Sequence, residues 1–419
     1  MGRAAKDTIP PFRGQKMDGQ RFLFAGTCYD VQDPLWEDAL AQAHADGGRP
    51  RCLCVSGGVE MYVARHQRRF IVKRMPGTGS LHQPRCPSFE PEAGQSGIGE
   101  LLGEAIVELA PGSVQLRVDF PWTRVSGRGV AAGEAADPGE VLSPQRRMSL
   151  RALTHFLFER AGFNRWSPAM AGKRNQGVIC KYLLDAASEL WVKGLPLDQR
   201  LYVPEPFSEA AKAEAAQRRR AKLAILQPRD GQVPLALVIG ELKTCELTPF
   251  GRRLWIRHMP DTPLLIAEKT WERVRRIFAA SFDVLDADAA YRPRLVTSAL
   301  IRAKREHVYE VDALHMMLTT EHWIPVEGAH DIELIHHLVE RQRRFIKPLR
   351  YDAKSAGGFP NALLLDVGPD PAGLHALSPF ADAKERAAKL HALTRQPEAW
   401  TWWTDQPMPP LPPMVEVGR

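Results

Sequence analysis

The sequence contains no apolar run close to about eighteen residues, which is the length that a membrane-spanning helix needs. Its first residues, Met1 to Lys6, have neither the apolar core of a signal peptide nor the serine or threonine of a myristoylation site. Glycine-rich phosphate motifs are also missing, because Pro76-Gly77-Thr78-Gly79 is not followed by Gly-Lys-Ser/Thr. We therefore expect a cytoplasmic protein that does not contact a membrane, and we predict no nucleotide-binding loop.

Cysteine is scarce, with six in 419 residues, and its distribution does not suit a disulfide scaffold. Three of the six lie between Arg51 and Glu90 beside histidines, whereas Cys28, Cys180 and Cys245 are scattered along the chain. Clustered cysteine and histidine in a reducing compartment favour metal binding over disulfide bridging.

The segment from Arg51 to Glu90 has the pattern of a small metal-binding module. Residues 59–64 and 69–74 read as two strands of a hairpin, and the turn-rich residues 76–80 return the chain toward its start. Three thiolates and one imidazole are a ligand set that holds zinc in a closed, structural site. The predicted ligands are Cys52, Cys54, His82 and Cys86. The alternative is three unrelated cysteines that are buried as small hydrophobic residues.

The charge balance is basic, with a net charge of +7 and a pI near 9.1. Basic side chains neutralise phosphates, and the aromatic residues Phe70, Phe345 and Tyr351 lie among them, as in a groove that binds a nucleic-acid backbone with stacked bases. Solvated basic faces are the alternative interpretation. The residues predicted to bind nucleic acid are Arg69, Lys73, Arg74, Lys173, Arg174, Arg343, Arg344, Lys347 and Arg350.

Glu241 and Lys243 end an apolar strand and are two positions apart, so a regular strand would place both side chains on one face. A carboxylate that binds Mg²⁺ and a neighbouring ammonium that activates water are parts of metal-dependent phosphodiester hydrolysis. The pair resembles the second half-motif of restriction-endonuclease-like nucleases, although the preceding proline-aspartate half-motif is absent. The alternative is a solvated ion pair.

A second candidate for chemistry lies near the end of the chain and comprises Asn361, Asp366, His375 and Lys389. It has the outline of the same nuclease core, with asparagine in place of the usual aspartate. Without that carboxylate the affinity for a metal should be poor. We therefore interpret this group as inactive or structural.

Alternating strand and helix patterns predict an α/β or α+β fold, in which a small zinc-binding β module precedes a larger mixed part. A restriction-endonuclease-like sheet is one form that this larger part could take. We expect helices at 98–109 and 311–317, among others. The predicted divisions are an N-terminal domain at 1–125, a linker at 126–145, a helical hairpin with a mixed sheet at 146–300, a C-terminal α/β domain at 301–405 and a proline-rich tail at 406–419.

Several stretches together resemble a bacterial family of unknown function that is associated with conjugative plasmids and integrative elements. A looser similarity, confined to the cysteine and histidine segment and the following sheet, is to competence protein CoiA-like proteins. The first resemblance rests on the run from Cys52 to Cys86, Gly172-Lys173-Arg174, Gly240-Glu241-Leu242-Lys243, Trp323-Ile324-Pro325 and Phe345 to Tyr351.

We therefore expect a zinc-stabilised, nucleic-acid-associated protein of a bacterial mobile element. The resemblance implies no established activity. A magnesium-dependent nuclease and a scaffold that binds protein partners in a DNA-transfer apparatus are the two alternatives.

Overall fold

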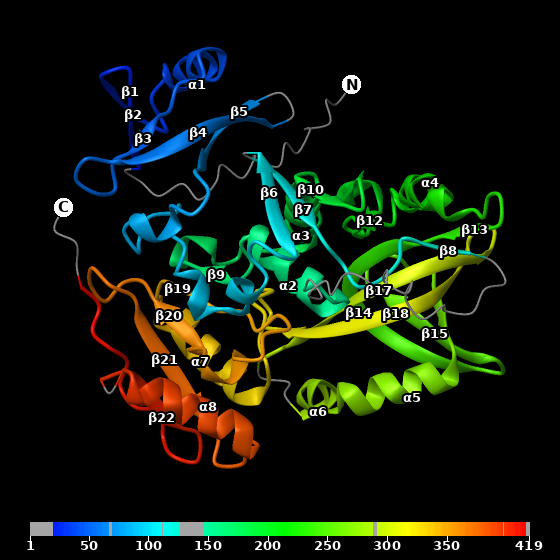
Figure 1. Cartoon of the computed structure of the whole chain (residues 1–419). Coiled ribbons are helices and arrows are strands. Elements are labelled where there is room, and N and C mark those ends of the chain that lie inside the picture. The colour runs from blue at the N-terminus through cyan, green and yellow to red at the C-terminus, as the bar shows by residue number, and fades with distance from the viewer. Residues whose placement is uncertain are drawn as a thin grey trace, which may run out of the picture. The chain divides into compact units, whose positions relative to one another are not determined.

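A computed structural model describes residues 20–66, 69–110, 112–125, 146–287, 291–396 and 398–415 of the chain. The chain divides into two compact units, Met1–Glu92 and Ala93–Arg419. The described residues form eight α-helices and five sheets, so the predicted mixed α/β fold is confirmed (Figure 1). A bilayer-crossing helix is absent from this described part of the chain. The predicted linker at 126–145 lies outside it.

The first unit is built on a five-stranded antiparallel sheet with strand order β2-β1-β3-β4-β5. Strands β4 and β5 form the hairpin that the alternating pattern of residues 59–74 predicted. The elements of this unit are β1 (Arg21–Phe24), β2 (Thr27–Asp30), α1 (Trp36–Ala45), β3 (Arg51–Cys52), β4 (Val59–His66) and β5 (Arg69–Arg74).

Helix α1 covers one face of this sheet. The indole of Trp36 stacks on the ring of Phe22, with 5.0 Å between centroids, and His44 lies 4.9 Å from Phe70. The strand register places Phe22 and Phe70 on the same face. The residues of α1 that are buried recur at the spacing of a single helical face and are Trp36, Ala39, Leu40 and Ala43.

The second unit contains the other seven helices of the described residues and begins before the predicted boundary at 125. Residues 93–125 belong to it because β7 pairs in parallel with β10, and β8 pairs with β13. Its helices are α2 (Leu150–Arg160), α3 (Gln176–Ala187), α4 (Lys212–Leu223), α5 (Glu268–Ile277), α6 (Ala279–Ala287), α7 (Ala329–Glu340) and α8 (Ala383–Thr394).

The strands of the second unit form four sheets, with orders β11-β10-β7-β6, β12-β14-β15-β16-β18-β17, β13-β8 and β22-β21-β20-β19-β9. Their bounds are β6 (Ile106–Ala110), β7 (Ser113–Leu116), β8 (Thr123–Val125), β9 (Arg165–Trp166), β10 (Leu190–Val192), β11 (Leu195–Pro196), β12 (Leu201–Tyr202), β13 (Gln232–Pro234), β14 (Ala236–Thr248), β15 (Gly251–Ile256), β16 (Leu264–Ile266), β17 (Arg294–Arg305), β18 (Val308–Thr319), β19 (Phe345–Ile346), β20 (Ala362–Leu364), β21 (Ala372–Leu377) and β22 (Trp400–Trp403).

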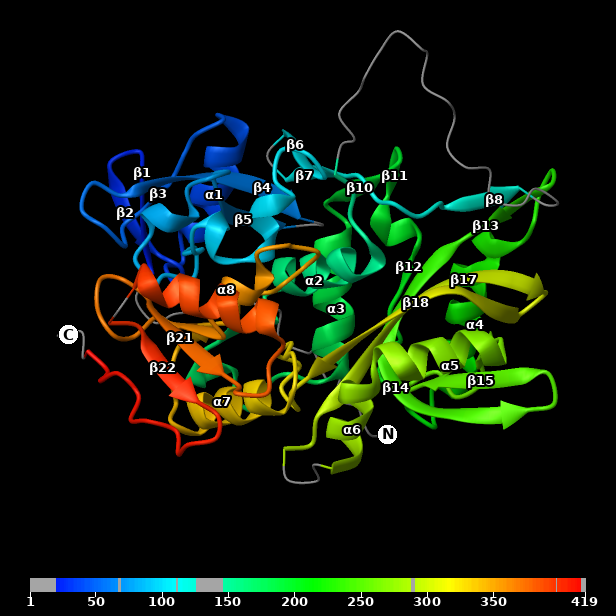
Figure 2. The ribbon, with the colours of Figure 1, turned by 60° about the horizontal axis from the view of Figure 1, so that its bottom comes forward.

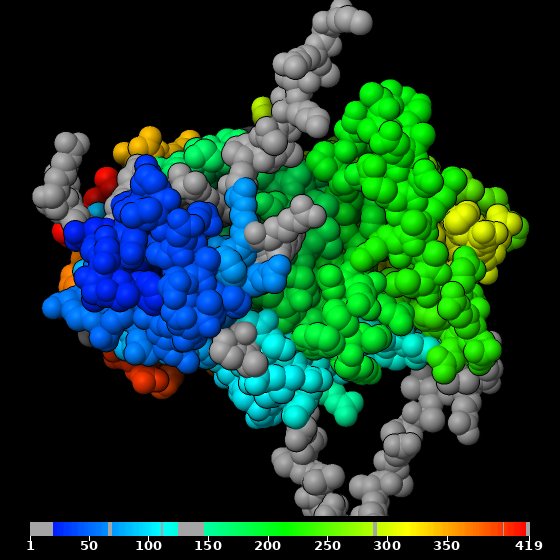
Figure 3. Space-filling view, turned by 90° about the horizontal axis from the view of Figure 1, so that it is seen from above, coloured from blue at the N-terminus to red at the C-terminus, as the bar shows by residue number. Residues whose placement is uncertain are grey.

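The six-stranded sheet is organised around the long strand β14. Because β14 pairs with both β15 and β17, the pairings β14-β15-β16-β18-β17 close into a ring. The register of β14 against β15 shifts between Leu242 and Thr244, which is the mark of a β-bulge. The turn of the β17–β18 hairpin reaches the surface, where it lies in yellow beside green segments of the same unit (Figure 3).

The last third of the chain forms a compact α/β layer in the order α7-β19-β20-β21-α8-β22 (Figures 1 and 2). Strands β19, β20 and β21 form an antiparallel meander, and β22 returns through α8 to lie parallel to β21. The strands are short and fully apolar in places, since Ala362, Leu363 and Leu364 are all buried.

Two of the segments that the sequence predicted as helices have another structure. Residues 311–317, predicted as a helix, lie within β18, which pairs with β17 along most of its length. Residues 98–109, predicted as one helix, form a short 3-10 turn at Gly97–Glu100 and most of β6. Gly103 separates these two elements with a φ of 80°, which a helix cannot contain. Cross-strand pairing overrides the local helical pattern in the first case.

Candidate metal centre

The end of strand β3 positions two of the predicted ligands. Cys52 is the last residue of β3 and is fully buried, and the backbone N–H of Leu53 donates to the carbonyl of Arg21 at 3.0 Å. Cys54 follows in the loop, and a turn with positive φ at Gly58 then returns the chain to β4. A side chain at Gly58 would be strained by this φ and would lie 3.1 Å from the side chain of Arg51.

A compact loop after β5 positions the other two ligands. The backbone N–H of His82 donates to Gly79 at 3.3 Å, and that of Cys86 donates to Gln83 at 2.8 Å. The loop is closed by Glu90, whose N–H donates to the carbonyl of Gly79 at 3.1 Å. Glycine is required at position 79, because a Cβ there would lie 2.6 Å from the Cβ of Glu90.

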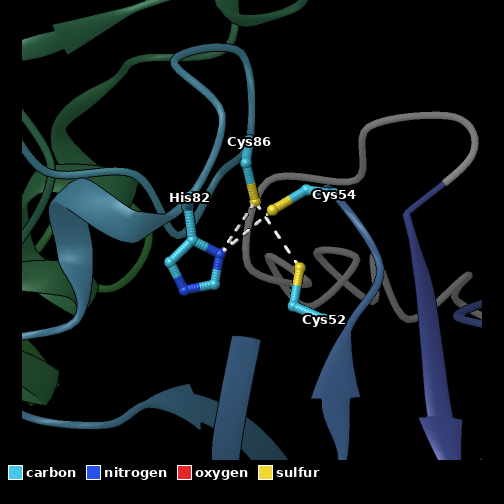
Figure 4. A group of neighbouring side chains, drawn as sticks. All are labelled: Cys52, Cys54, His82 and Cys86. Atoms are coloured by element: carbon cyan, nitrogen blue, oxygen red, sulfur yellow. Dashed lines mark hydrogen bonds between the residues drawn. The ribbon is translucent and has the colours of Figure 1, made fainter. Parts of the chain in front are cut away.

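The four predicted side chains point toward one another (Figure 4). The Sγ atoms of Cys52 and Cys86 are 3.7 Å apart, and the Nδ1 atom of His82 lies 3.3 Å from Cys54 Sγ and 3.6 Å from Cys86 Sγ. All four donor atoms lie within 4.8 Å of one another. A tetrahedral zinc ion with ordinary bond lengths would separate two sulfurs by about 3.8 Å and a sulfur and a nitrogen by about 3.6 Å. The three separations given above lie within about 0.3 Å of those edges.

Hydrogen bonds within the cluster shift its proton affinities. Hydrogen bonds from Cys54 and Cys86 lower the pKa of Cys52, while the hydrogen bonds to Cys52 and Cys54 raise the pKa of Cys86. Burial lowers the pKa of His82, but the hydrogen bonds and negative charge of Cys52 and Cys54 outweigh it and raise this pKa to about 9. The cluster therefore favours a thiolate at Cys52 and a protonated thiol at Cys86. Metal ligands must be deprotonated, so a bound dication would take the place of these protons.

The donor set and its spacing could bind a metal ion such as zinc. Among the described residues, this is the single group of three or more histidine, cysteine or acidic side chains placed to do so. Outer contacts hold the ligands, because the backbone N–H of Ser88 lies 3.4 Å from Cys86 Sγ and the amide of Gln20 lies 3.8 Å from Cys52 Sγ. Such second-layer contacts orient metal ligands.

A mixed α/β chain with a Cys3His cluster is the class of protein that this fold and site define. A family model described as "Protein of unknown function (DUF1173)" matches residues 22–405, and the chain belongs to this family. The match confirms the resemblance to a family of unknown function and spans both units. No curated protein and no solved structure matched the chain. The family description names no activity, so the residues themselves carry the functional argument.

Two of the basic residues predicted to bind nucleic acid, Arg343 and Lys347, lie in the interior of the second unit, and a third, Arg174, is half-buried. Arg343 is 4% exposed and Lys347 is 3% exposed, and they form ion pairs with Asp366 and Asp331 at 2.7 and 2.9 Å. Arg174 donates to the backbone carbonyls of residues 162, 163, 165 and 322, and burial lowers its pKa to about 9. Arg343 and Lys347 therefore do not line a surface that a phosphate could reach, and the guanidinium of Arg174 is occupied by backbone carbonyls.

The other predicted basic residues lie at or near the surface. Arg69 and Lys173 are exposed, whereas Lys73, Arg74, Arg344 and Arg350 are half-buried. Arg74 pairs with Glu90 at 2.5 Å, and Arg350 pairs with Glu385 at 2.7 Å. The basic residues of the β4–β5 hairpin therefore remain surface candidates, whereas of the basic residues within 343–350 only Arg343 and Lys347 are interior.

Glu241 is buried, 6% exposed, and both of its carboxylate oxygens are engaged. Arg257 Nε lies 2.6 Å from one oxygen and Arg294 Nη1 lies 2.8 Å from the other. Lys243 is exposed and lies at the point where the strand register shifts, so the two side chains are not related by simple alternation. No metal-binding group includes Glu241 among the described residues. Through Arg294, Glu241 therefore links β14 to β17. The magnesium site stays a prediction, and these ion pairs do not favour it.

We expect Glu241→Gln to lower the free energy of unfolding by about 1–2 kcal/mol, because it weakens two hydrogen bonds to charged arginines that are partly exposed. Lys243→Ala, an exposed control on the same strand, should change it by less than about 0.5 kcal/mol. Urea unfolding of both variants measures the difference. Magnesium-dependent DNA cleavage that disappears in folded Glu241→Gln protein would instead support the nuclease hypothesis.

The second candidate group is only partly assembled. Asn361 and Lys389 meet, with 2.7 Å between Oδ1 and Nζ, whereas Asp366 is engaged by Arg343. His375 is buried, and its Nδ1 has no hydrogen-bond partner among the described residues. The sequence interpretation missed Asp331, which contacts Asn361 at 2.8 Å. Its position after Gly328 marked only the start of a helix, and nothing in the sequence tied it to Asn361 thirty residues later.

Proposed function

We propose that Cys52, Cys54, His82 and Cys86 bind one structural zinc ion. The observation that carries this proposal is the match between the donor separations and the edges of a zinc tetrahedron. Four protein ligands leave no open position for a substrate, so the site is structural rather than catalytic. Elemental analysis of freshly purified protein tests it, with one zinc per chain as the expected result and a zinc-free chain as the result that rejects it.

We further propose that this zinc-stabilised unit associates with nucleic acid. Between Arg49 and Arg85 the chain has eight arginine and lysine residues and a single acidic one, Glu60. Lys73 pairs with Tyr62 in the β4–β5 register, and Arg69 lies four positions before Lys73 on the same strand, so the three side chains share one face. Helix α1 contacts Phe70 on the opposite face. Cations beside an aromatic ring suit a phosphate backbone with a stacked base.

Binding of single- or double-stranded DNA should weaken steeply as salt rises, since each phosphate contact releases counterions. The double variant Arg69→Ala, Lys73→Ala should lower affinity at low salt and reduce the slope of log K against log salt by about 1–2. Fluorescence anisotropy with labelled oligonucleotides measures both quantities. Arg273→Ala, which removes an exposed arginine from α5 in the other unit, is the matched control. If the wild type, the double variant and the control had equal salt slopes, Arg69 and Lys73 would not contact the nucleic acid.

The setting we propose is the cytoplasm of a bacterium that carries a mobile element, on the strength of the family resemblance described above. In such a cell, a zinc-stabilised module that binds DNA would help to handle the transferred DNA strand. The scaffold alternative predicts that the chain binds a protein of a transfer apparatus and no nucleic acid. The absence of DNA binding at low salt, with zinc present and both units folded, would favour that alternative.

A further inference from the structure

A pocket of about 220 Å³ opens in the second unit between the first turn of α7, the β21–α8 connection and α8 itself. Figures 1 and 2 show α7 and α8 on the sheet that contains β20 and β21. The pocket shares no residue with the metal cluster, and neither proposal above uses it. Its charged lining residues are Glu327, Asp331, Arg350, Glu385, Arg386 and Lys389.

The floor of this pocket is a buried hydrogen-bond network. Asp331, 3% exposed, pairs with Lys347 at 2.9 Å and accepts a hydrogen bond from Asn361 Nδ2 at 2.8 Å. The Oδ1 atom of Asn361 accepts from the backbone N–H of Ala376 at 3.0 Å and from Lys389 Nζ at 2.7 Å. Every contact of Asn361 agrees with one orientation of its amide. The side chain that faces the amine of Lys389 is therefore a fixed, neutral acceptor.

Lys389 contacts two neutral acceptors, whereas Lys347 contacts a carboxylate. Lys389 is 4% exposed, and its Nζ donates to Asn361 Oδ1 and to the carbonyl of Phe359 at 2.5 Å. Within the described residues no carboxylate lies within ion-pair distance of this Nζ, whereas Lys347 has Asp331. An ammonium that is buried without an ionic partner is costly, so the neutral amine is favoured. Two acceptors use both hydrogens of a neutral amine and leave its lone pair free.

The surrounding charges act on the pKa of Lys389 in both directions, and burial decides the outcome. Burial is the main cause that lowers its pKa to about 7, and Lys347 and Arg350 contribute to that decrease. Asp331 and Glu385 oppose it, and the neighbouring His375 is held neutral because burial lowers its own pKa to about 4. Lysines that are desolvated beside other cations are the ones that react as nucleophiles near neutral pH.

We propose that Lys389 is a reactive amine that forms a Schiff base with a small aldehyde or 2-oxo acid held in this pocket. The volume suits a compound of a few heavy atoms, since pockets for drug-sized ligands start at about 300 Å³. The first turn of α7, which lines the pocket, and Arg386 on α8 would attract the anionic end of such a compound. This inference does not depend on the zinc or nucleic-acid proposals.

The step balances without a further reactant. The lone pair of Lys389 Nζ attacks the carbonyl carbon and forms a carbon–nitrogen bond, giving a carbinolamine. Both amine hydrogens pass to the former carbonyl oxygen, which leaves as water, and a carbon–nitrogen double bond remains. Nothing is oxidised or reduced. As the amine loses its hydrogens, Asn361 Oδ1 and the carbonyl of Phe359 lose their donors, so the carbinolamine hydroxyl can take up one of these bonds.

The test treats the full chain at pH 7 with glyoxylate and sodium cyanoborohydride, which reduces the imine to a stable secondary amine, and maps modified lysines by mass spectrometry. Lys384 is exposed on the same helix and is the internal control. Lys389 should react at least about tenfold faster, because ordinary lysines with a pKa near 10.4 are almost wholly protonated at this pH. Its rate should rise with pH and level off above about 7. A rate no greater than that of Lys384 would overturn the proposal.

Asn361→Asp gives a second, independent readout. It keeps the shape of the side chain but places a carboxylate about where Oδ1 now lies, 2.7 Å from Nζ. That charge would stabilise the ammonium, so labelling of Lys389 at pH 7 should slow at least about fivefold and its pH midpoint should move up. Labelling of Lys384 should not change. An unchanged rate at Lys389 would show that this contact does not control the amine. Glyoxylate that binds and protects the pocket without forming an adduct would also overturn the Schiff base.

Discussion

Loss of one zinc ligand is expected to unfold the first unit and leave the second folded. Structural zinc contributes about 10–16 kcal/mol in small zinc-binding peptides, and here it would join the end of β3 to the loop after β5. The apolar core around Phe22 and Trp36 is small and cannot replace that contribution. In Cys86→Ser protein, amide hydrogen exchange should become fast throughout 20–92, while α2 and β14 keep their protection.

Cys28→Ser is the matched control, since Cys28 is an exposed cysteine of the same unit and lies outside the cluster. This variant should retain its metal and its exchange protection. A chelator should reproduce the effect of Cys86→Ser in the wild type, and added zinc should reverse it. Full protection of the first unit in protein shown to be free of metal would reject a structural role for zinc.

Removal of one partner from the Arg343–Asp366 pair should cost about 3–5 kcal/mol, because it leaves the other charge buried without compensation. Both residues are at most 4% exposed, and the guanidinium meets the carboxylate at 2.7, 3.1 and 3.2 Å. Asp366 Oδ2 also accepts from the backbone N–H of Arg344 at 2.7 Å. We expect Asp366→Ala to shift the urea midpoint of the second unit strongly.

The comparison for this pair is Arg302 with Glu310, which lie 3.0 Å apart near the surface and should contribute only about 0–1 kcal/mol. Replacing both interior residues, as Arg343→Met with Asp366→Leu, should recover much of the lost stability. Folded Arg343→Ala protein should keep the salt dependence of DNA binding. If Arg343→Ala protein instead lost DNA affinity with unchanged stability, Arg343 would be a nucleic-acid contact.

The metal cluster could be predicted because all of its determinants are local. Cys52, Cys54, His82 and Cys86 fall within 35 residues of one another, and a hairpin followed by a turn-rich segment brings the ends of such a stretch together. Residue types with strong chemical preferences then restrict the grouping further. The pairing of β4 with β5 agrees with the alternation seen in the sequence.

The fate of the basic clusters could not be predicted in the same way. An arginine followed by apolar residues can face solvent or the interior, and the sequence does not show which carboxylate will meet it. Arg343 is buried because β20 delivers Asp366 beside it, and Lys347 is buried because α7 presents Asp331. Residues 311–317 illustrate the same limit. They form a strand because they pair with β17 across a hairpin, and their own sequence pattern does not show this partner.

The proline-rich tail offers a simple reporter of the interior. Arg343 donates to the carbonyl of Pro412 at 2.8 Å, Trp400 donates to Pro410 at 2.9 Å, and the N–H of Val415 donates to the carbonyl of Asp366 at 2.9 Å. The guanidinium that pairs with the buried carboxylate of Asp366 thus also binds the backbone of the tail. Any change that loosens this arginine should release the segment around residues 406–415 to proteases before the rest of the unit opens, so limited proteolysis would detect local opening that global unfolding curves average away.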